Sequence, residues 1–186
     1  MKNKQLLRKR FLKLRKKKYY EIPDYKLSLL IEYIKKRIKK KKLSIIALYY
    51  PSNFEFNIFK ILNYLKKYNT KFLLPIVQDS RKLKFERWDE RDILLVNKFG
   101  IPEPIKSKKN YLPDIVLVPL LAFDNEKNRL GYGKGFYDKY LSNLVKINTK
   151  AEAIGIAFSF QKYKKIPTSK FDFQLNRIFT EKGFMK

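Results

Sequence analysis

The sequence of 186 residues contains no cysteine and no histidine. The absence of cysteine excludes disulfides, thiolate catalysis and zinc–thiolate sites. The absence of histidine removes the commonest general base and the commonest transition-metal ligand. Any chemistry must therefore rest on acidic, basic or tyrosine side chains, or on a hard metal ion such as Mg²⁺ held by oxygen atoms.

Long uncharged apolar runs are also missing. No stretch of about 18 such residues occurs, so we expect no contact with a membrane. The first 18 residues are basic and lack the apolar core of a secretory signal, which favours a cytoplasmic protein. The length and the 45% of hydrophobic residues fit one folded domain over 1–186, with 1–18 as a basic N-terminal helix. No unexplained apolar face is evident, so we expect a monomer.

Acidic residues are few, since 17 Asp and Glu stand against 44 Lys and Arg, for a net charge of +27. Such a charge can indicate nucleic-acid binding through phosphate neutralisation. However, lysine far exceeds arginine, and Lys, Ile, Asn, Tyr and Phe share AT-rich codons, so genome bias explains the composition without a partner. We expect no nucleic-acid partner, and keep a basic α/β RNA-binding module without catalysis as the alternative. The basic field would still attract polyanionic substrates.

Apolar periodicity predicts alternating helices and strands. Helices are expected over residues 3–18, 25–41, 56–67 and 137–145. Strands are expected over 43–50, 71–77, 83–88, 114–120 and 153–158, with a short one near 178–180. This order predicts an α/β three-layer sandwich, Rossmann-like, with a mostly parallel central sheet and helices on both faces. Because ligands bind beyond the carboxyl ends of parallel strands, the loops after 43–50 and 114–120 should open on the same edge.

Glycine is scarce but clustered. Of six glycines, three fall within five residues: Gly131, Gly133 and Gly135. Glycine costs backbone entropy, so the cluster predicts a geometric need, such as close approach of backbone amides to a ligand. The segment matches neither GxxxxGK[ST] nor GxGxxG, and a purely structural turn is the alternative. Arg129 and Lys134 add positive charge and Asp138 adds a carboxylate, which favours a nucleotide phosphate site.

The segment that contains these glycines, Phe123 to Asp138, resembles the signature of the 5-formyltetrahydrofolate cyclo-ligase family. Further stretches are similar to family landmarks in the same order, over residues 4–8, 49–55, 100–104, 113–119 and 154–172. The resemblance implies ATP- and Mg²⁺-dependent closure of 5-formyltetrahydrofolate to 5,10-methenyltetrahydrofolate, through a phosphorylated formyl intermediate, with release of ADP and phosphate. It implies ATP as co-substrate, Mg²⁺ as cofactor, and a folate with or without a polyglutamate tail. Phosphoryl transfer needs positioning and charge neutralisation more than a protein nucleophile, which suits a chain without His or Cys.

Residue by residue, the resemblance implies an ATP site at Lys4, Arg8, Arg129, Leu130, Gly131, Tyr132, Gly133, Lys134, Gly135, Phe136 and Tyr137. Lys134 and Arg129 would be catalytic, with Lys134 stabilising the transferring phosphoryl group. Lys4 and Arg8 stand four residues apart, on one helical face, although a solvated basic helix is the alternative for them. Asp138 and Asp172 would be the metal ligands.

The resemblance also implies a folate site at Tyr50, Glu55, Trp88, Tyr132 and Phe136. Glu55 matches the folate-binding glutamate, since a carboxylate can accept hydrogen bonds from the amino and ring N–H groups of a pterin. On its own, Glu55 would more often complement a helix dipole. Aromatic residues are so frequent in this chain that any single one more often belongs to the core.

Four positions depart from the family pattern. Phe136 stands where Tyr is often found, which removes a hydroxyl from the pocket. Phe171 replaces a frequent His, and Asn57 a frequent Thr. Asn176 stands where some relatives carry another acid, which weakens the case for a second metal contact at Asp172.

Loss of activity is a further alternative, because some relatives of a fold bind ligands without catalysis. The chain would then be a nucleotide- or folate-binding regulator. The joint presence of Lys134, Asp138 and Glu55 favours an enzyme.

Overall fold

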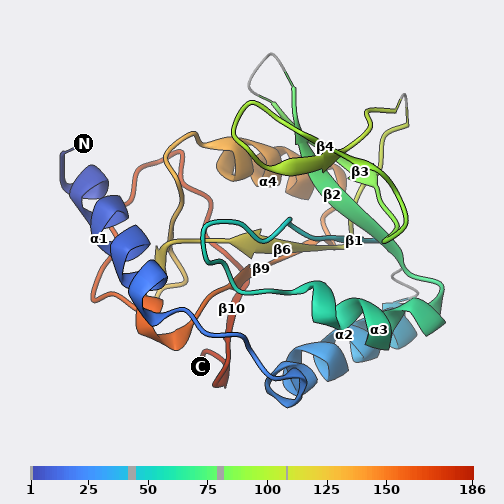
Figure 1. Ribbon diagram of the computed structural model, residues 1–186, viewed down its shortest axis with the longest axis horizontal. Helices are drawn as coiled ribbons and strands as arrows, with labels where there is room; N and C mark the ends of the chain where they lie inside the picture. Colours follow the sequence, from blue (N-terminus) through green and yellow to red (C-terminus); the bar gives the residue numbers. More distant parts are fainter. Residues whose placement is uncertain (1, 42–44, 79–81, 108) are drawn as a thin grey trace.

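The computed structural model describes residues 2–41, 45–78, 82–107 and 109–186 (Figure 1). Its centre is a seven-stranded sheet in the order β11-β10-β9-β6-β1-β2-β3. The strands are β1 (Ile45–Ala47), β2 (Lys71–Val77), β3 (Leu83–Arg87), β6 (Ile115–Pro119), β9 (Glu152–Ile156), β10 (Arg177–Thr180) and β11 (Gly183–Phe184). The strands from β10 to β2 run parallel, and β11 and β3 are antiparallel at the two edges. The mostly parallel sheet predicted from the sequence is confirmed.

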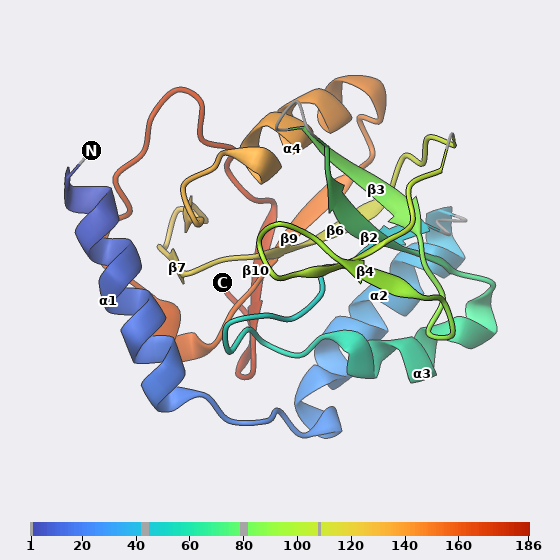
Figure 2. The same cartoon turned by 45° about the horizontal axis from the view of Figure 1, so that its top comes forward.

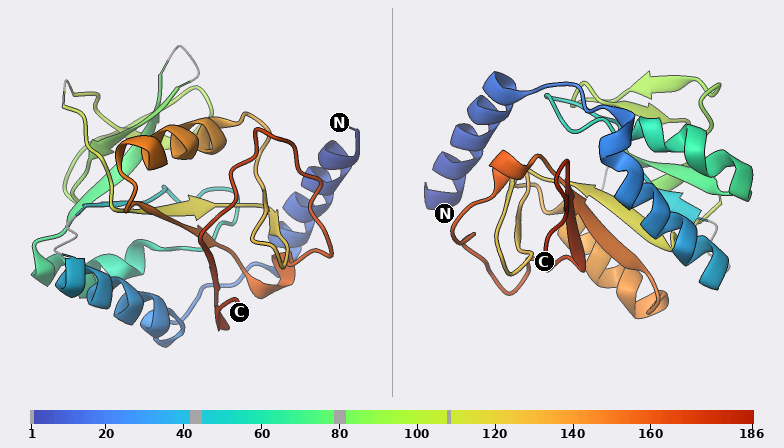
Figure 3. Two further views of the ribbon diagram at one scale, coloured as in Figure 1. Left: turned by 180° about the vertical axis from the view of Figure 1, so that it is seen from behind. Right: turned by 90° about the horizontal axis from the view of Figure 1, so that it is seen from below.

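Helices cover both faces of this sheet. The α-helices are α1 (Lys2–Lys18), α2 (Ser28–Lys41), α3 (Leu62–Leu65) and α4 (Phe136–Ile147). Short 3₁₀ helices span Asp24–Leu27, Phe59–Ile61, Lys66–Tyr68 and Ser159–Gln161. Figures 1 and 3 show α4 on one face, and α2 and α3 on the other. This arrangement confirms the three-layer α/β sandwich.

Side-chain alternation along β6 explains the layers. Ile115 and Leu117 pack in the cluster that contains α2 and α3, whereas Val116 and Val118 pack in the cluster that contains α4. All four side chains are fully buried, because a parallel strand covered on both faces needs apolar residues on both. The uninterrupted apolar run that predicted a strand at 114–120 reflects this double burial.

Two predicted elements are shorter in the structure. The helix expected over 56–67 is α3 flanked by two 3₁₀ turns, since β-branched and aromatic residues dominate its start and favour helix weakly. The spacing of the apolar residues in this segment instead identifies the buried side chains, which are Ile58, Ile61, Leu62 and Leu65. The strand expected over 43–50 is β1 alone; residues 43 and 44 lie outside the described residues, and the strand ends at Ala47, with one further backbone bond from Leu48 to Leu73 of β2.

Two small hairpins were not predicted. One pairs β4 (Leu94–Val96) with β5 (Pro102–Pro104), where the sequence suggested only a break at 100–104. The other pairs β7 (Ala122–Phe123) with β8 (Arg129–Leu130), directly after β6. Strands of two or three residues are too short for a periodic signal.

The helix α1 packs against the β7–β8 hairpin. Leu7 and Phe11 of the helix pack against Leu121, Ala122, Leu130 and Ile166. Figure 2 shows α1 beside β7, beyond the end of the sheet rather than on either face. Within the described ranges, no helix combines the length and apolarity needed to cross a bilayer.

Candidate active site

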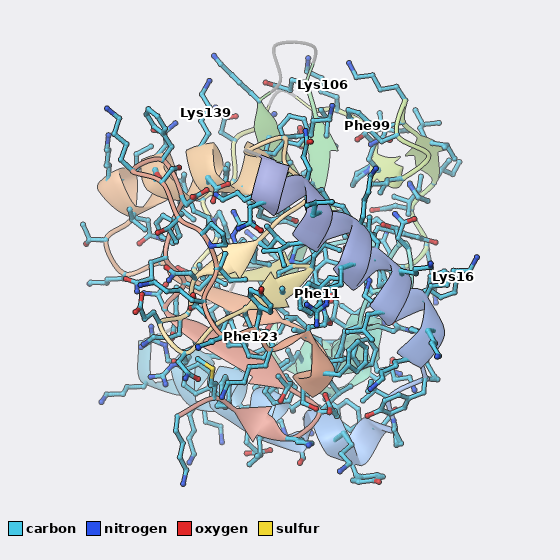
Figure 4. The ribbon with its side chains drawn as sticks, turned by 90° about the vertical axis from the view of Figure 1, so that its left-hand side faces the viewer. Phe11, Lys16, Phe99, Lys106, Phe123 and Lys139 are labelled. Atoms are coloured by element: carbon cyan, nitrogen blue, oxygen red, sulfur yellow. The ribbon has the colours of Figure 1, made fainter. Side chains whose placement is uncertain are left out.

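A cavity of about 390 Å³ lies beyond the carboxyl ends of β1, β2 and β6. Its walls come from α1, the loop after β1, the segment from β8 into α4, the β4–β5 hairpin and Asp172. Figure 4, viewed from the side of α1, shows this helix crossing the front of the molecule, with Phe99 of the hairpin also facing this side. The predicted convergence of the loops after β1 and β6 is therefore confirmed.

Every predicted site residue except Trp88 lines this cavity. Trp88 is buried in the core cluster of α2 and α3, where its ring stacks on Phe59 with centroids 5.0 Å apart. Its predicted contact with substrate has no support from the cavity lining.

The glycine segment turns from β8 into α4. Gly133 and Gly135 have φ values of +98° and +68°, a backbone region that residues other than glycine rarely adopt. A Cβ at Gly133 would lie 2.9 Å from Cζ of Arg8. Gly135 is the N-cap of α4, and no side chain of the described residues caps the helix, so its first amide N–H groups remain available to an anion.

Two cations of α1 face this segment. Arg8 donates from Nε to the carbonyl oxygen of Gly131 at 2.9 Å, and Lys4 Nζ lies 2.7 Å from Oδ2 of Asp172. Hydrophobic anchoring of α1 on the β7–β8 hairpin places both side chains on the cavity wall. Lys4 and Arg8, whose place at the nucleotide site the family resemblance implied, therefore line the same cavity.

Arg129 is buried and donates from Nη2 to Oδ1 of Asp138 at 2.6 Å. Burial lowers the pKa of Arg129, and the negative charge of Asp138 opposes this shift. Asp138 also accepts a hydrogen bond from the backbone N–H of Phe173 at 3.1 Å. This ion pair therefore joins the glycine segment to the loop that carries Asp172.

Asp172 accepts hydrogen bonds at Oδ2 from Lys4 and from the backbone N–H of Ser169, at 2.7 and 2.6 Å. Burial alone would raise the pKa of Asp172, but these bonds and the charge of Lys4 outweigh it and leave the pKa below its usual value. Asp172 is thus ionised at neutral pH.

Lys134 is exposed at the cavity rim. In the described part of the chain, its ammonium group has no hydrogen bond or ion pair. A flexible cation without a protein partner can follow a phosphoryl group as it moves.

Glu55, in the loop after β1, also lines the cavity and is buried. Its Oε1 accepts a hydrogen bond from the Tyr132 hydroxyl at 2.5 Å, and its Oε2 accepts one from the Ser52 backbone N–H at 2.9 Å. Burial raises the pKa of Glu55, while the charge of Arg15 and the bonds from Tyr132 and Ser52 lower it. A buried acceptor of this kind suits a ligand that presents N–H donors.

Sequence reasoning missed Arg15, a buried arginine of α1 that contacts the loops around the cavity. Arg15 follows Arg8 by seven residues, so both lie near the same helical face, and arginine is rare beside lysine in this chain. That spacing could have identified it. The lining residues of β2, β3 and the β4–β5 hairpin were also missed: Pro75, Val77, Leu83, Asn97, Phe99 and Ile101.

Comparison with known proteins yields one consistent result. A model of the 5-formyltetrahydrofolate cyclo-ligase family matches residues 1–181. A Haemophilus influenzae protein named 5-formyltetrahydrofolate cyclo-ligase is 34% identical over 144 residues, covering 74% of this chain and 76% of that protein.

Two solved structures of proteins named 5,10-methenyltetrahydrofolate synthetase are also similar. The Aquifex aeolicus protein superposes with a TM-score of 0.70 at 28% identity, covering 98% of this chain and 92% of the other. The Mycoplasma pneumoniae protein superposes with a TM-score of 0.71 at 26% identity, covering 96% and 98%.

Proposed function

Since this chain belongs to the 5-formyltetrahydrofolate cyclo-ligase family, whose members convert 5-formyltetrahydrofolate to 5,10-methenyltetrahydrofolate with ATP, we propose that its cavity brings the γ-phosphate of ATP to the formyl group. The observation that carries the proposal is the set of side chains that line the site. One cavity is lined by cations and glycines, at what we propose is its phosphate end, and by the buried carboxylate of Glu55, at the proposed folate end. Two chemically different substrates can therefore meet between them.

The triphosphate lies, in this proposal, against the glycine segment and the start of α4. The uncapped N–H groups of α4 and the side chains of Lys4, Arg8 and Arg129 surround its charge. Lys134 neutralises the charge on the transferring phosphoryl group, because it is the cation without a competing partner in the described residues. Leu130, Tyr132, Phe136 and Tyr137 complete the nucleotide wall.

The acidic residues fit Mg²⁺ bound largely through the nucleotide. Asp138 and Asp172 each use one carboxylate oxygen for protein hydrogen bonds, and no bond to the other oxygen occurs within the described chain. No group of three acidic residues able to hold a metal occurs in the described ranges. This suits Mg²⁺, which takes one or two carboxylates and completes its shell with water and phosphate. The ion would supply further neutralisation of phosphate charge.

Glu55 accepts hydrogen bonds from the pterin amino and ring N–H groups in this proposal. Its two oxygens already face polar partners on the protein side, which fixes the carboxylate plane. Tyr50 and Phe136 line the same cavity and offer ring surface to the pterin and aminobenzoyl groups. Within the same proposal, the enzyme acts as a monomer on folates with or without a polyglutamate tail.

The chemistry needs no protein nucleophile. The formyl oxygen attacks the γ-phosphorus, and the bond from that phosphorus to the ADP oxygen breaks. N10 of the folate then attacks the formyl carbon, the carbon–oxygen bond breaks, and phosphate leaves with the former formyl oxygen. N10 loses its proton, and the product is the 5,10-methenyl cation. The protein positions the substrates and neutralises charge, which is the main requirement of phosphoryl transfer.

A two-substrate turnover assay tests this proposal. With Mg²⁺ present, we expect ADP to form only when both ATP and 5-formyltetrahydrofolate are added, in equal amount to the methenyl product followed by absorbance. ADP formation without folate, or no absorbance change with both substrates, would contradict the proposal.

A further inference from the structure

Arg15 of α1 is buried, with an exposed side-chain fraction of 1%, yet it is not part of the cavity lining. Its guanidinium contacts three segments around the cavity. Nε donates to the carbonyl oxygen of Asn53 at 2.9 Å, and Nη1 donates to that of Leu120 at 3.3 Å. Nη2 donates to the Tyr132 hydroxyl at 2.5 Å. One side chain therefore joins the loop after β1, the end of β6 and the glycine segment.

The direction of hydrogen bonding around Tyr132 follows from the chemistry of arginine. A guanidinium has donors and no acceptor, so the Tyr132 oxygen must accept the bond from Arg15. The hydroxyl hydrogen of Tyr132 is then directed to Oε1 of Glu55. Arg15 thus sets the orientation of Tyr132, and Tyr132 sets that of the Glu55 carboxylate.

Arg15 also sets the electrostatics of Glu55, since its Nη1 lies 3.9 Å from Oε1. Among the described residues, no other cation lies within ion-pair distance of this carboxylate. The remaining titratable side chains that face Glu55 are phenols whose pKa values burial raises, so they stay neutral: Tyr49, Tyr132 and Tyr137. Burial raises the pKa of Glu55, and the charge of Arg15 is the largest opposing influence.

We propose that Arg15 is the positioning residue of the folate-binding end: it aligns the Tyr132 hydroxyl and holds Glu55 as a charged acceptor facing the substrate. The inference rests on the folate-binding role proposed for Glu55. Arg15 acts through these two side chains and does not touch the substrate itself.

The same helix connects the two ends of the site. Lys4, Arg8 and Arg15 lie within about 40° of one another around α1, at 3.6 residues per turn, and the first and last are about 16 Å apart along its axis. Lys4 and Arg8 reach the phosphate end, while Arg15 supports the folate end. A single rigid element therefore fixes the spacing between the two substrates.

The guanidinium geometry is essential to this role. Three acceptors in different directions require a planar group with several donors, which a lysine ammonium on its flexible stem cannot satisfy at once. Arg15→Lys therefore keeps the charge beside Glu55 but loses the alignment of Tyr132, whereas Arg15→Gln loses both.

The test is steady-state kinetics as a function of pH for the wild type, Arg15→Gln and Arg15→Lys. At neutral pH, Arg15→Gln should raise the KM for 5-formyltetrahydrofolate by about tenfold, the equivalent of one charged hydrogen bond. It should also shift the acidic limb of kcat/KM to higher pH, because more Glu55 becomes protonated, and leave the KM for ATP within about threefold. Arg15→Lys should return the acidic limb toward that of the wild type while the folate KM stays raised.

Two further variants serve as a control for the lost charge and as a substitute for Arg15→Gln. Arg10→Gln removes the same charge from an exposed position of the same helix and should behave as the wild type. Tyr132→Phe keeps Arg15 and the packing, so it replaces Arg15→Gln in the test if that variant does not fold. It should raise the KM for 5-formyltetrahydrofolate and shift the acidic limb of kcat/KM to higher pH. An unshifted acidic limb in Arg15→Gln or Tyr132→Phe, or equal rises in both KM values, would overturn the proposal.

Glu55→Gln separates this inference from the proposed function. An unchanged folate KM in Glu55→Gln would show that Glu55 does not bind the folate. A raised folate KM in Glu55→Gln, together with an unshifted acidic limb of kcat/KM in the Arg15 and Tyr132 variants, would contradict only the role assigned to Arg15.

Discussion

Arg129 donates to Asp138 across 2.6 Å, so a cation of the proposed phosphate site and a carboxylate of the proposed metal site form an ion pair with each other. Arg129 begins β8, and Asp138 lies in the first turn of α4. The pair therefore spans the glycine segment and fixes its two ends against each other. Because the Arg129 side chain is only 4% exposed, this carboxylate is needed to compensate its buried charge.

Loss of this pair should destabilise the fold. Arg129→Gln leaves the partly buried Asp138 without its cation, and we expect the free energy of unfolding to fall by about 3 kcal/mol, measured by urea denaturation. Arg177→Gln removes an arginine whose side chain is half exposed, from its pair with Glu152, and should cost less than about 1 kcal/mol. Equal losses in the two variants would show that the Arg129 pair has no special structural role.

Lys134→Ala should separate activity from stability. The side chain is exposed, so we expect the unfolding free energy to change by less than about 0.5 kcal/mol. Turnover should fall by about 10² to 10³, the usual effect of removing a group that stabilises transition-state charge. Lys139→Ala, at an exposed position on α4 labelled in Figure 4, is the matched control and should retain full activity. Comparable activity in the two variants would exclude Lys134 from the reaction.

Gly133→Ala should act through Arg8. The added Cβ would lie 2.9 Å from Cζ of Arg8 and displace the guanidinium, so we expect the KM for ATP to rise by about tenfold. Gly100→Ala places alanine at a similar φ of +74°, where no atom of the described residues lies within 4 Å of the added Cβ, and it should cost only the backbone strain of about 1 kcal/mol. In an Arg8→Ala background, the effect of Gly133→Ala on the KM should disappear; a persistent rise would point to direct contact with the nucleotide.

Glu55→Gln should change how stability depends on pH. The pKa of Glu55 is raised by burial, so the folded protein holds this proton more tightly than the unfolded chain does. The contribution of Glu55 to stability is therefore complete below the ordinary value of 4.5 and falls as pH rises through the raised folded pKa. Glutamine does not titrate, so the unfolding free energy of Glu55→Gln relative to the wild type should increase as the pH rises above 4.5. Denaturant titrations across this range measure the difference, and a decrease would contradict the sign.

Trp88→Phe should affect packing rather than binding. The indole is buried and stacks on Phe59, outside the cavity lining. We expect a lower melting temperature and an unchanged KM for 5-formyltetrahydrofolate. A rise in this KM without loss of stability would instead support a contact between Trp88 and the substrate.

The sequence predicted those features of the site that lie within one segment or one helix. The glycine cluster, with Arg129, Lys134 and Asp138, is contiguous, and Lys4 and Arg8 share a helical face. The common cavity of the glycine segment and the loop that carries Glu55 followed from the parallel sheet, because the strands before both loops end at one edge. The place of Lys4 and Arg8 at this cavity followed from the family resemblance.

Other features depend on distant packing, which periodicity does not encode. Phe99 reaches the cavity only because β4 and β5 pair, and those strands have three residues each. Trp88 faces the core because β3 pairs antiparallel with β2 at the sheet edge. The partners of Arg15 come from three separate segments, 38 to 117 residues away in the chain.

The fate of the formyl oxygen tests the central claim most directly. The enzyme is supplied with ATP and 5-formyltetrahydrofolate labelled with ¹⁸O in the formyl group, and the released phosphate is analysed by mass spectrometry. Transfer of the γ-phosphoryl group to the formyl oxygen predicts one ¹⁸O atom in each phosphate formed. Unlabelled phosphate, with the label lost to water, would contradict the account.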